Sequence, residues 1–173
     1  LSIVMPAYNE EKMIMKAAYT ISQLLKEEKI DSEILFVNDG SKDNTWQEIQ
    51  RASQEMNNVR GISFSRNFGK ESAILAGIEH AKGDCCVVMD CDLQHPPETV
   101  IEMYRLWEDG FEIVEGVKKS RGQEGKIKTL FTKGFYQLIN RATGFDMSTS
   151  SDFKLLDRKV IEAYLKLPER KLF

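Results

Sequence analysis

Two carboxylates placed two residues apart are the side chains of this sequence best suited to chemistry. Asp90 and Asp92 directly follow residues 85–89, an apolar run typical of a strand buried on both faces. Side chains at positions i and i+2 of an extended chain point to the same side, so the two charges repel unless a cation neutralises them. Mg²⁺ and Mn²⁺ prefer oxygen ligands and often link carboxylates to a substrate diphosphate. We therefore predict a metal site (Mg²⁺ or Mn²⁺) at Asp90 and Asp92, the alternative being a pair of solvated turn acids.

Two further polar segments each follow an apolar run. In residues 37–41, Asp39 could accept hydrogen bonds from a base or a ribose, or could form an ordinary Asx turn. In residues 65–70, Arg66 or Lys70 could meet a phosphate at a helix N-terminus, or the segment could be a solvated loop. The spacing of a P-loop is absent.

A basic stretch and two isolated groups complete the candidates. Residues 118–133 contain five Lys and one Arg against a single acid, which indicates either a site for an anionic group or a solvated helix face. Arg121 stands among Gly and Ser, where a bidentate phosphate contact is possible. Asp152 could act as a general base or cap a strand or helix, and His95 could touch metal or phosphate.

The elements that must position these side chains alternate between strand and helix. Strands are predicted at 2–5 (ended by Pro6), 34–37, 59–64, 85–89, 112–117 and 153–156, and helices at 11–28, 43–56, 71–81, 97–108, 126–142 and 158–167. This alternation predicts an α/β sandwich with a mainly parallel central sheet. Ligands of such sheets bind beyond the carboxyl ends of the strands, which selects residues 6–10, 38–41, 65–70 and 90–94.

Composition limits the class of protein. A chain of 173 residues suits a single domain, and its net charge of -3 argues against a nucleic-acid binder. Cys85, Cys86 and Cys91 lie too close together for a disulfide framework or a zinc site, so we expect buried thiols and a reducing, cytoplasmic compartment. No apolar run approaches the ~18 residues of a membrane span. The chain begins at Leu1 within a predicted strand, so we expect a fragment of a longer protein.

Five motifs in order resemble the inverting family-2 glycosyltransferases of GT-A fold, over nearly the whole chain. The resemblance is strongest to the dolichyl-phosphate mannose synthase and bactoprenol glucosyltransferase branch. The motifs are V-M-P-A-Y-N-E-E, V-N-D-G-S-K-D-N-T, S-R-N-F-G-K-E, M-D-C-D-L-Q-H-P-P-E and S-D-F-K-L-L-D-R. The implied fold is a Rossmann-like three-layer sandwich of GT-A type.

The resemblance implies a donor site at the first three motifs. Pro6, Tyr8 and Glu10 would line the nucleotide base pocket. Asp39 would lie near the base or the ribose, and Lys70 near the donor.

The remaining motifs would hold the reacting groups. Asp90 would contact the ribose or the metal, and Asp92 and Gln94 would hold the metal and the diphosphate. Arg121 would contact the acceptor phosphate or the donor diphosphate. Asp152 matches the acid assigned as base in relatives, where it would deprotonate or only position the acceptor.

The activity implied is that of an inverting hexosyltransferase. It would move a sugar from a nucleotide-sugar, of UDP-glucose or GDP-mannose type, to a polyprenyl phosphate in a metal-dependent reaction. The catalytic domain would lie at the cytoplasmic face of the cell membrane, with the membrane reached through segments outside this chain. A homo-oligomer is compatible with the sequence, which leaves the oligomeric state open. The alternatives are transfer to a sugar hydroxyl of a polysaccharide or glycan, an inert sugar-nucleotide-binding domain, and a nucleotidyltransferase.

Overall fold

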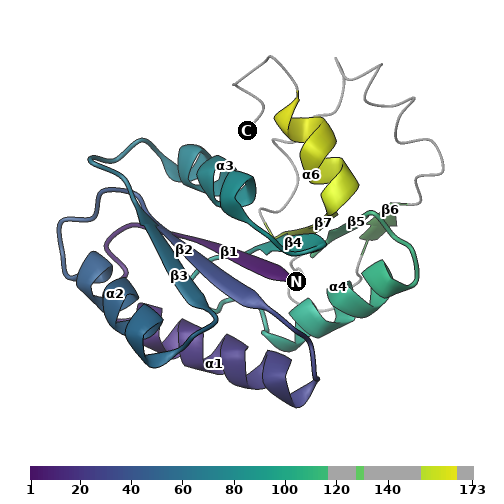
Figure 1. Cartoon of the computed structure of the whole chain (residues 1–173), viewed down its shortest axis with the longest axis horizontal. Helices are drawn as coiled ribbons and strands as arrows, with labels where there is room; N and C mark the ends of the chain where they lie inside the picture. The colour runs from purple at the N-terminus through teal and green to yellow at the C-terminus, as the bar shows by residue number, and fades with distance from the viewer. Residues whose placement is uncertain (117–127, 131–152, 167–173) are drawn as a thin grey trace, which may run out of the picture.

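The computed structural model describes residues 1–116, 128–130 and 153–166 of the chain, and its elements follow the predicted alternation of strand and helix through residue 116 (Figure 1). In chain order they are β1 (Ser2–Ala7), α1 (Ile14–Glu27), β2 (Glu33–Asn38), α2 (Thr45–Glu55), β3 (Val59–Ser63), α3 (Lys70–His80), β4 (Cys85–Val88), α4 (Glu98–Glu108), β5 (Ile113–Glu115), β6 (Lys128–Leu130), β7 (Lys154–Asp157) and α6 (Arg158–Leu165).

The strands form one sheet in the order β3-β2-β1-β4-β7-β5-β6. The pairs β3–β2, β2–β1 and β1–β4 are parallel, whereas β7 lies antiparallel to both β4 and β5, and β6 antiparallel to β5. β5 therefore runs in the same direction as β1 to β4, so the sheet is mainly parallel, as predicted. The strands β1, β2 and β4, which precede the predicted site segments, are neighbours at its centre.

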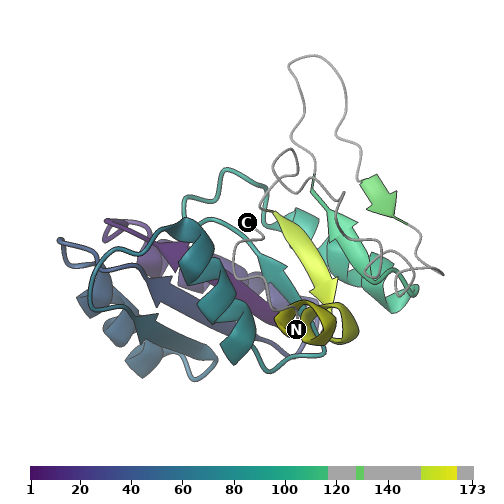
Figure 2. The same ribbon diagram turned by 90° about the horizontal axis from the view of Figure 1, so that it is seen from above.

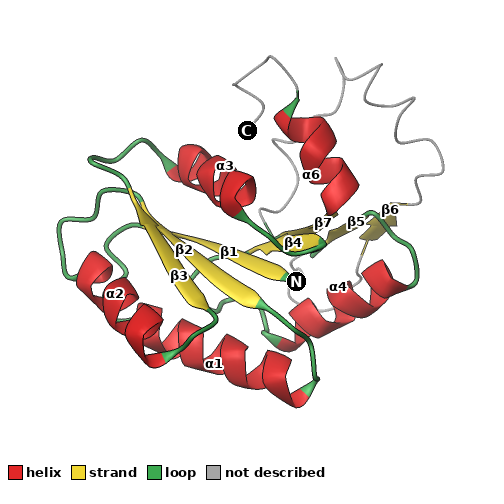
Figure 3. Ribbon diagram, in the orientation of Figure 1, coloured by secondary structure: helices red, strands yellow, loops and turns green. Residues whose placement is uncertain are grey.

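Helices cover both faces of the sheet and make three layers (Figure 3). The larger core lies between the sheet and α1, α2 and α4, and the smaller one between the sheet and α3 and α6, the face seen in Figure 2. Alternate residues of β1 divide between them, since Ile3 and Met5 enter the larger core and Val4 the smaller. This alternation of side chains within an apolar strand is what a sheet covered on both faces requires.

The prediction that Pro6 ends the first strand is wrong. β1 runs through Pro6 to Ala7, with Pro6 paired to Val37 of β2. The carbonyl of Pro6 accepts a hydrogen bond from the Cys91 thiol, on the side of β4, and β4 pairs with β1 only as far as Val4. A proline has no backbone N–H to donate. At Pro6 this position faces the side of β4, where β4 no longer pairs with β1, so the sheet loses no hydrogen bond.

The predicted helix over 126–142 is also wrong at its start, because residues 128–130 form β6. β6 pairs with β5 in the register Ile113 to Leu130 and Glu115 to Lys128. The edge of β5 that faces away from β7 offers unpaired backbone groups to another strand, and the helical periodicity of residues 126–142 does not reveal this partner. Residues 131–142 lie outside the described part of the chain.

The three cysteines are buried free thiols, as predicted. Burial raises the pKa of the Cys86 thiol to about 12, so it stays protonated and behaves as a small apolar side chain. Among the described helices, none combines the length and the apolar character needed to cross a membrane.

Candidate active site

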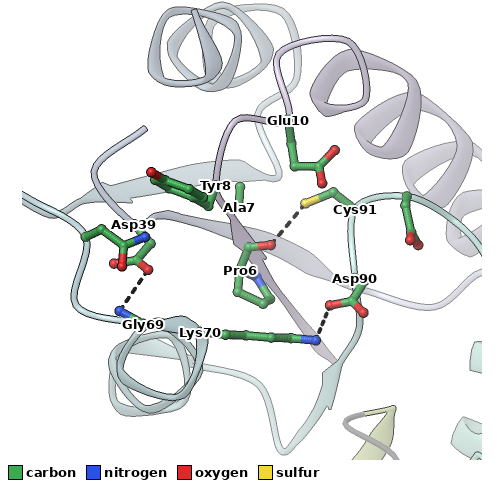
Figure 4. A pocket seen from close by; sticks show the side chains of 11 residues that line it. Pro6, Ala7, Tyr8, Glu10, Asp39, Gly69, Lys70, Asp90 and Cys91 are labelled. Atoms are coloured by element: carbon green, nitrogen blue, oxygen red, sulfur yellow. Dashed lines mark hydrogen bonds and ion pairs between the residues drawn. The ribbon is translucent and has the colours of Figure 1, made fainter. Parts of the chain in front are cut away.

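A cavity of about 400 Å³ opens at the carboxyl ends of the central strands (Figure 4). Each of the four segments selected from the sequence contributes to its wall. The lining residues are Pro6, Ala7, Tyr8, Glu10, Asp39, Asn67, Gly69, Lys70, Asp90, Cys91 and Asp92. Parallel strands end at one edge of a sheet, which is why segments far apart in the sequence meet here.

Hydrogen bonds between the loops after β1 and β2 fix one side of this cavity. The amide of Asn9 donates to the Ser41 hydroxyl at 2.9 Å, and the Asn9 side-chain oxygen accepts from the amide of Lys42 at 2.9 Å. The next amide, that of Glu10, donates to the Thr45 hydroxyl at 2.8 Å. Asn9 has a φ of 57°, a left-handed conformation that asparagine tolerates better than most residues. The loop that carries Tyr8 and Glu10 is thus held in place by α2 and the segment before it.

Asp39 binds the loop that precedes α3. Its carboxylate is buried and accepts hydrogen bonds from the amides of Phe68, at 2.7 Å, and Gly69, at 2.9 Å. Gly40, at a φ of 63°, lets the two loops approach, since a Cβ there would lie 2.3 Å from the backbone of Arg66. Asp39 lines the cavity, and its contact with these two amides was not foreseen from the sequence.

Asp90 and Asp92 lie together on the side of the cavity nearest β4. The Lys70 ammonium, at the start of α3, lies 2.7 Å from an Asp90 carboxylate oxygen (Figure 4). The Asp92 carboxylate accepts from the amide of Gln94 at 3.0 Å, across a turn in which Leu93 has a φ of 56°. Gln94 therefore shapes the acidic turn through its backbone, and it is not among the residues that line the cavity.

Glu10 faces this acidic pair from the loop after β1. Its pKa is raised above the ordinary value, first by burial and then by the negative charges of Asp92, Asp90 and Asp43. Three carboxylates thus contribute to a field that favours a cation in the cavity. The field is a property of the folded chain, because Glu10 and Asp92 are distant in the sequence.

We predict that replacing Glu10 by Gln slightly stabilises the protein at pH 7. Because its pKa is raised in the folded state, Glu10 contributes stability when protonated, below about pH 4.5, and this contribution is lost as pH rises through the folded-state pKa. Gln resembles the protonated, uncharged carboxyl group, so the variant keeps this contribution at pH 7. The gain should stay below about 1 kcal/mol because solvent screens this partly exposed group. Urea unfolding at pH 7 and pH 4 measures it, with the exposed Glu102→Gln as control. A gain that persists unchanged at pH 4 would refute the electrostatic origin.

Two predicted site residues, Arg121 and Asp152, lie outside the described residues, as does most of the basic stretch. His95 does not line the cavity. Its ring packs on that of Phe153, with the centroids 4.4 Å apart and the planes at 30°. This contact joins the loop after β4 to the start of β7, and no spacing in the sequence indicates it.

Comparison with known proteins identifies the family. Residues 2–165 match glycosyl transferase family 2. The chain belongs to this family. An uncharacterized glycosyltransferase of Synechocystis sp. is 41% identical over the whole chain, and the bactoprenol glucosyl transferase of Shigella phage SfV is 36% identical over the whole chain. The chain spans only about half the length of these family-2 relatives, 55% and 57% respectively.

Solved structures confirm the GT-A fold predicted for this family-2 chain. A mannosyltransferase of Pyrobaculum calidifontis, in complex with GDP-Man and Mn²⁺, superposes with a TM-score of 0.63 at 17% identity. The match covers 94% of this chain and 46% of that one. Because the two sequences are only 17% identical, the similarity of the structures shows a shared fold and nothing more.

The acidic pair fits a divalent metal that takes part of its coordination from a substrate. Both carboxylates line the cavity, and a lysine ammonium already lies against one of them. In the part of the chain that the structure describes, no cluster of three or more His, Cys, Asp or Glu is arranged to hold a metal ion. Mg²⁺ sites of this kind use one or two carboxylates together with substrate phosphates and water.

Proposed function

We propose that this domain transfers a hexose from a nucleotide-sugar of UDP-glucose or GDP-mannose type to a polyprenyl phosphate, with inversion and with the help of Mg²⁺ or Mn²⁺. The observation that carries the proposal is the acidic pair Asp90 and Asp92, which lines a cavity at the carboxyl edge of the sheet in a family-2 domain, with the Lys70 ammonium in contact with Asp90. The phage relative, a bactoprenol glucosyl transferase by name, supports the lipid acceptor.

The donor would lie along the cavity from the β1 loop to the β4 loop. Tyr8, 42% exposed, would offer a ring face to the base, and Pro6 and Glu10 would line the same pocket, with Glu10 on the side toward the acidic pair. Asp90 and Asp92 would hold the metal, which supplies positive charge to the leaving diphosphate. The Lys70 ammonium would add a second positive charge there.

The chemical step would be a single displacement at the anomeric carbon. An oxygen of the acceptor phosphate attacks that carbon as the bond to the nucleoside diphosphate breaks, and the diphosphate leaves with the electron pair. A phosphate monoester is mostly ionised at neutral pH, since its second pKa is about 6. Such a nucleophile carries no proton that must be removed, and Arg121 would hold it or the diphosphate by a bidentate contact. Asp152 would then position the acceptor.

Replacing Asp152 by Asn should therefore leave the rate with a polyprenyl phosphate within about tenfold of wild type, less than the loss expected for an essential general base. Steady-state kinetics at saturating acceptor measure this. A loss of 1,000-fold or more, in a variant that still binds the donor, would assign proton abstraction to Asp152.

Incubation with each donor and with a short polyprenyl phosphate in detergent tests the function itself. Transfer releases a nucleoside diphosphate and labels the lipid with the sugar. Pyrophosphate formation would indicate nucleotidyl transfer instead, and sugar incorporated only into a glycan would indicate a hydroxyl acceptor. The membrane-bound setting, at the cytoplasmic face and through segments outside this chain, is part of the proposal.

A further inference from the structure

Lys70 and Asp90 form an ion pair in the wall of the cavity. The ammonium lies 2.7 Å from the carboxylate oxygen, and both side chains are partly exposed, at 43% and 40%. Lys70 is the first residue of α3, an 11-residue helix, where the positive end of the helix dipole disfavours a cation. Its position is therefore not explained by the stability of α3.

The backbone that carries Lys70 is fixed independently of this pair. The buried Asp39 carboxylate holds the amides of Phe68 and Gly69, the two residues before it. Gly69 has a φ of 99°, a conformation that a side chain rarely allows. The start of α3 is thus anchored to the loop after β2, and the Lys70 ammonium, at the far end of a four-carbon side chain, takes no part in this anchoring.

The pair sets two cations in competition for one carboxylate. While Lys70 contacts Asp90, a divalent ion must displace the ammonium or accept a repulsive neighbour. A nucleoside diphosphate changes this balance, because its phosphate oxygens offer Lys70 another negative partner in the same cavity. Release of Asp90 would then coincide with arrival of the diphosphate.

We propose that Lys70 couples metal binding to donor binding: its ammonium pairs with Asp90 until a nucleoside diphosphate attracts it, and only then is Asp90 available to the metal. The inference rests on the proposed function and deepens it. Coupling between two ligands is reciprocal, so the metal must increase nucleotide affinity by the same factor.

Calorimetry with Mn²⁺ alone, and then with Mn²⁺ in the presence of UDP or GDP, measures this coupling. For the wild type we expect the nucleotide to tighten Mn²⁺ binding at least about fivefold. In Lys70→Met, Mn²⁺ alone should bind about three- to tenfold more tightly, since an exposed ammonium no longer competes. The coupling factor should fall in the same variant by about the same three- to tenfold, and the coupling that remains comes from the diphosphate oxygens that the metal itself contacts.

Two further variants serve as controls. Lys70→Arg keeps a cation and should retain most of the coupling, whereas Lys16→Met, on the exposed face of α1, removes the same charge and should change neither quantity. Wild-type coupling that persists in Lys70→Met would overturn the inference and leave the proposed function standing. Failure of the wild type to bind Mn²⁺ with either nucleotide would contradict the proposed function, and the inference with it.

Discussion

Replacing Asp92 by Asn is expected to lower the rate of sugar transfer by at least about 100-fold, the loss typical of removing a group that stabilises developing transition-state charge. The carboxylate lines the cavity beside Asp90, and its loss would leave the metal a single acidic ligand in this turn. Asn is nearly isosteric and retains an oxygen that can accept from the amide of Gln94, so the turn should persist. The effect should therefore appear in activity and metal affinity and not in stability.

Initial rates over a range of Mn²⁺ concentrations, with thermal unfolding alongside, test this prediction. Asp109→Asn provides the matched control, because Asp109 is an exposed acid at the end of α4 and does not line the cavity. An Asp92→Asn variant that transfers sugar at a wild-type rate would remove Asp92 from the proposed site.

Replacing Phe36 by Ala is expected to destabilise the protein by about 3–5 kcal/mol, the usual cost of truncating a buried phenylalanine. Phe36 is fully buried in β2, where it faces the larger core opposite Met5 of β1. β2 also carries the Asp39 loop, so the loss should reduce the population of molecules with an intact cavity.

Urea unfolding followed by circular dichroism measures the loss, with Phe68→Ala as the same substitution at an exposed site. Phe68 is 49% exposed and contacts Phe64 and Arg66, so its truncation should cost about 1 kcal/mol or less. Equal losses at the two positions would contradict the assignment of Phe36 to the core.

Local sequence patterns were sufficient for the parallel half of the fold. Apolar runs followed by polar turns predicted β2 and β4, and the rule that ligands bind at the carboxyl edge selected the segments that line the cavity. Asp90 and Asp92 could be placed at this edge from the sequence because both directly follow a buried strand, and both line the cavity.

The antiparallel end of the sheet was harder to predict, because strand pairing there depends on distant partners. Residues 128–130 have helical periodicity in sequence but meet the edge of β5 in space. Likewise, nothing local to Asp39 shows that its carboxylate holds the amides of Phe68 and Gly69, about thirty residues away. The ion pair between Lys70 and Asp90 belongs to the same class of contact, since it forms only once α3 packs against β1 and β2 and so brings Lys70 to the loop after β4.

Calorimetric titration of UDP-glucose and GDP-mannose into this domain, with and without Mn²⁺, tests the central claim most directly. The proposed site predicts that one of the two donors binds, that Mn²⁺ strengthens the binding, and that Asp92→Asn loses the metal-dependent part. The claim would be contradicted if neither donor bound to a folded sample. It would also be contradicted if the affinity for the donor changed neither with Mn²⁺ nor with the Asp92→Asn substitution.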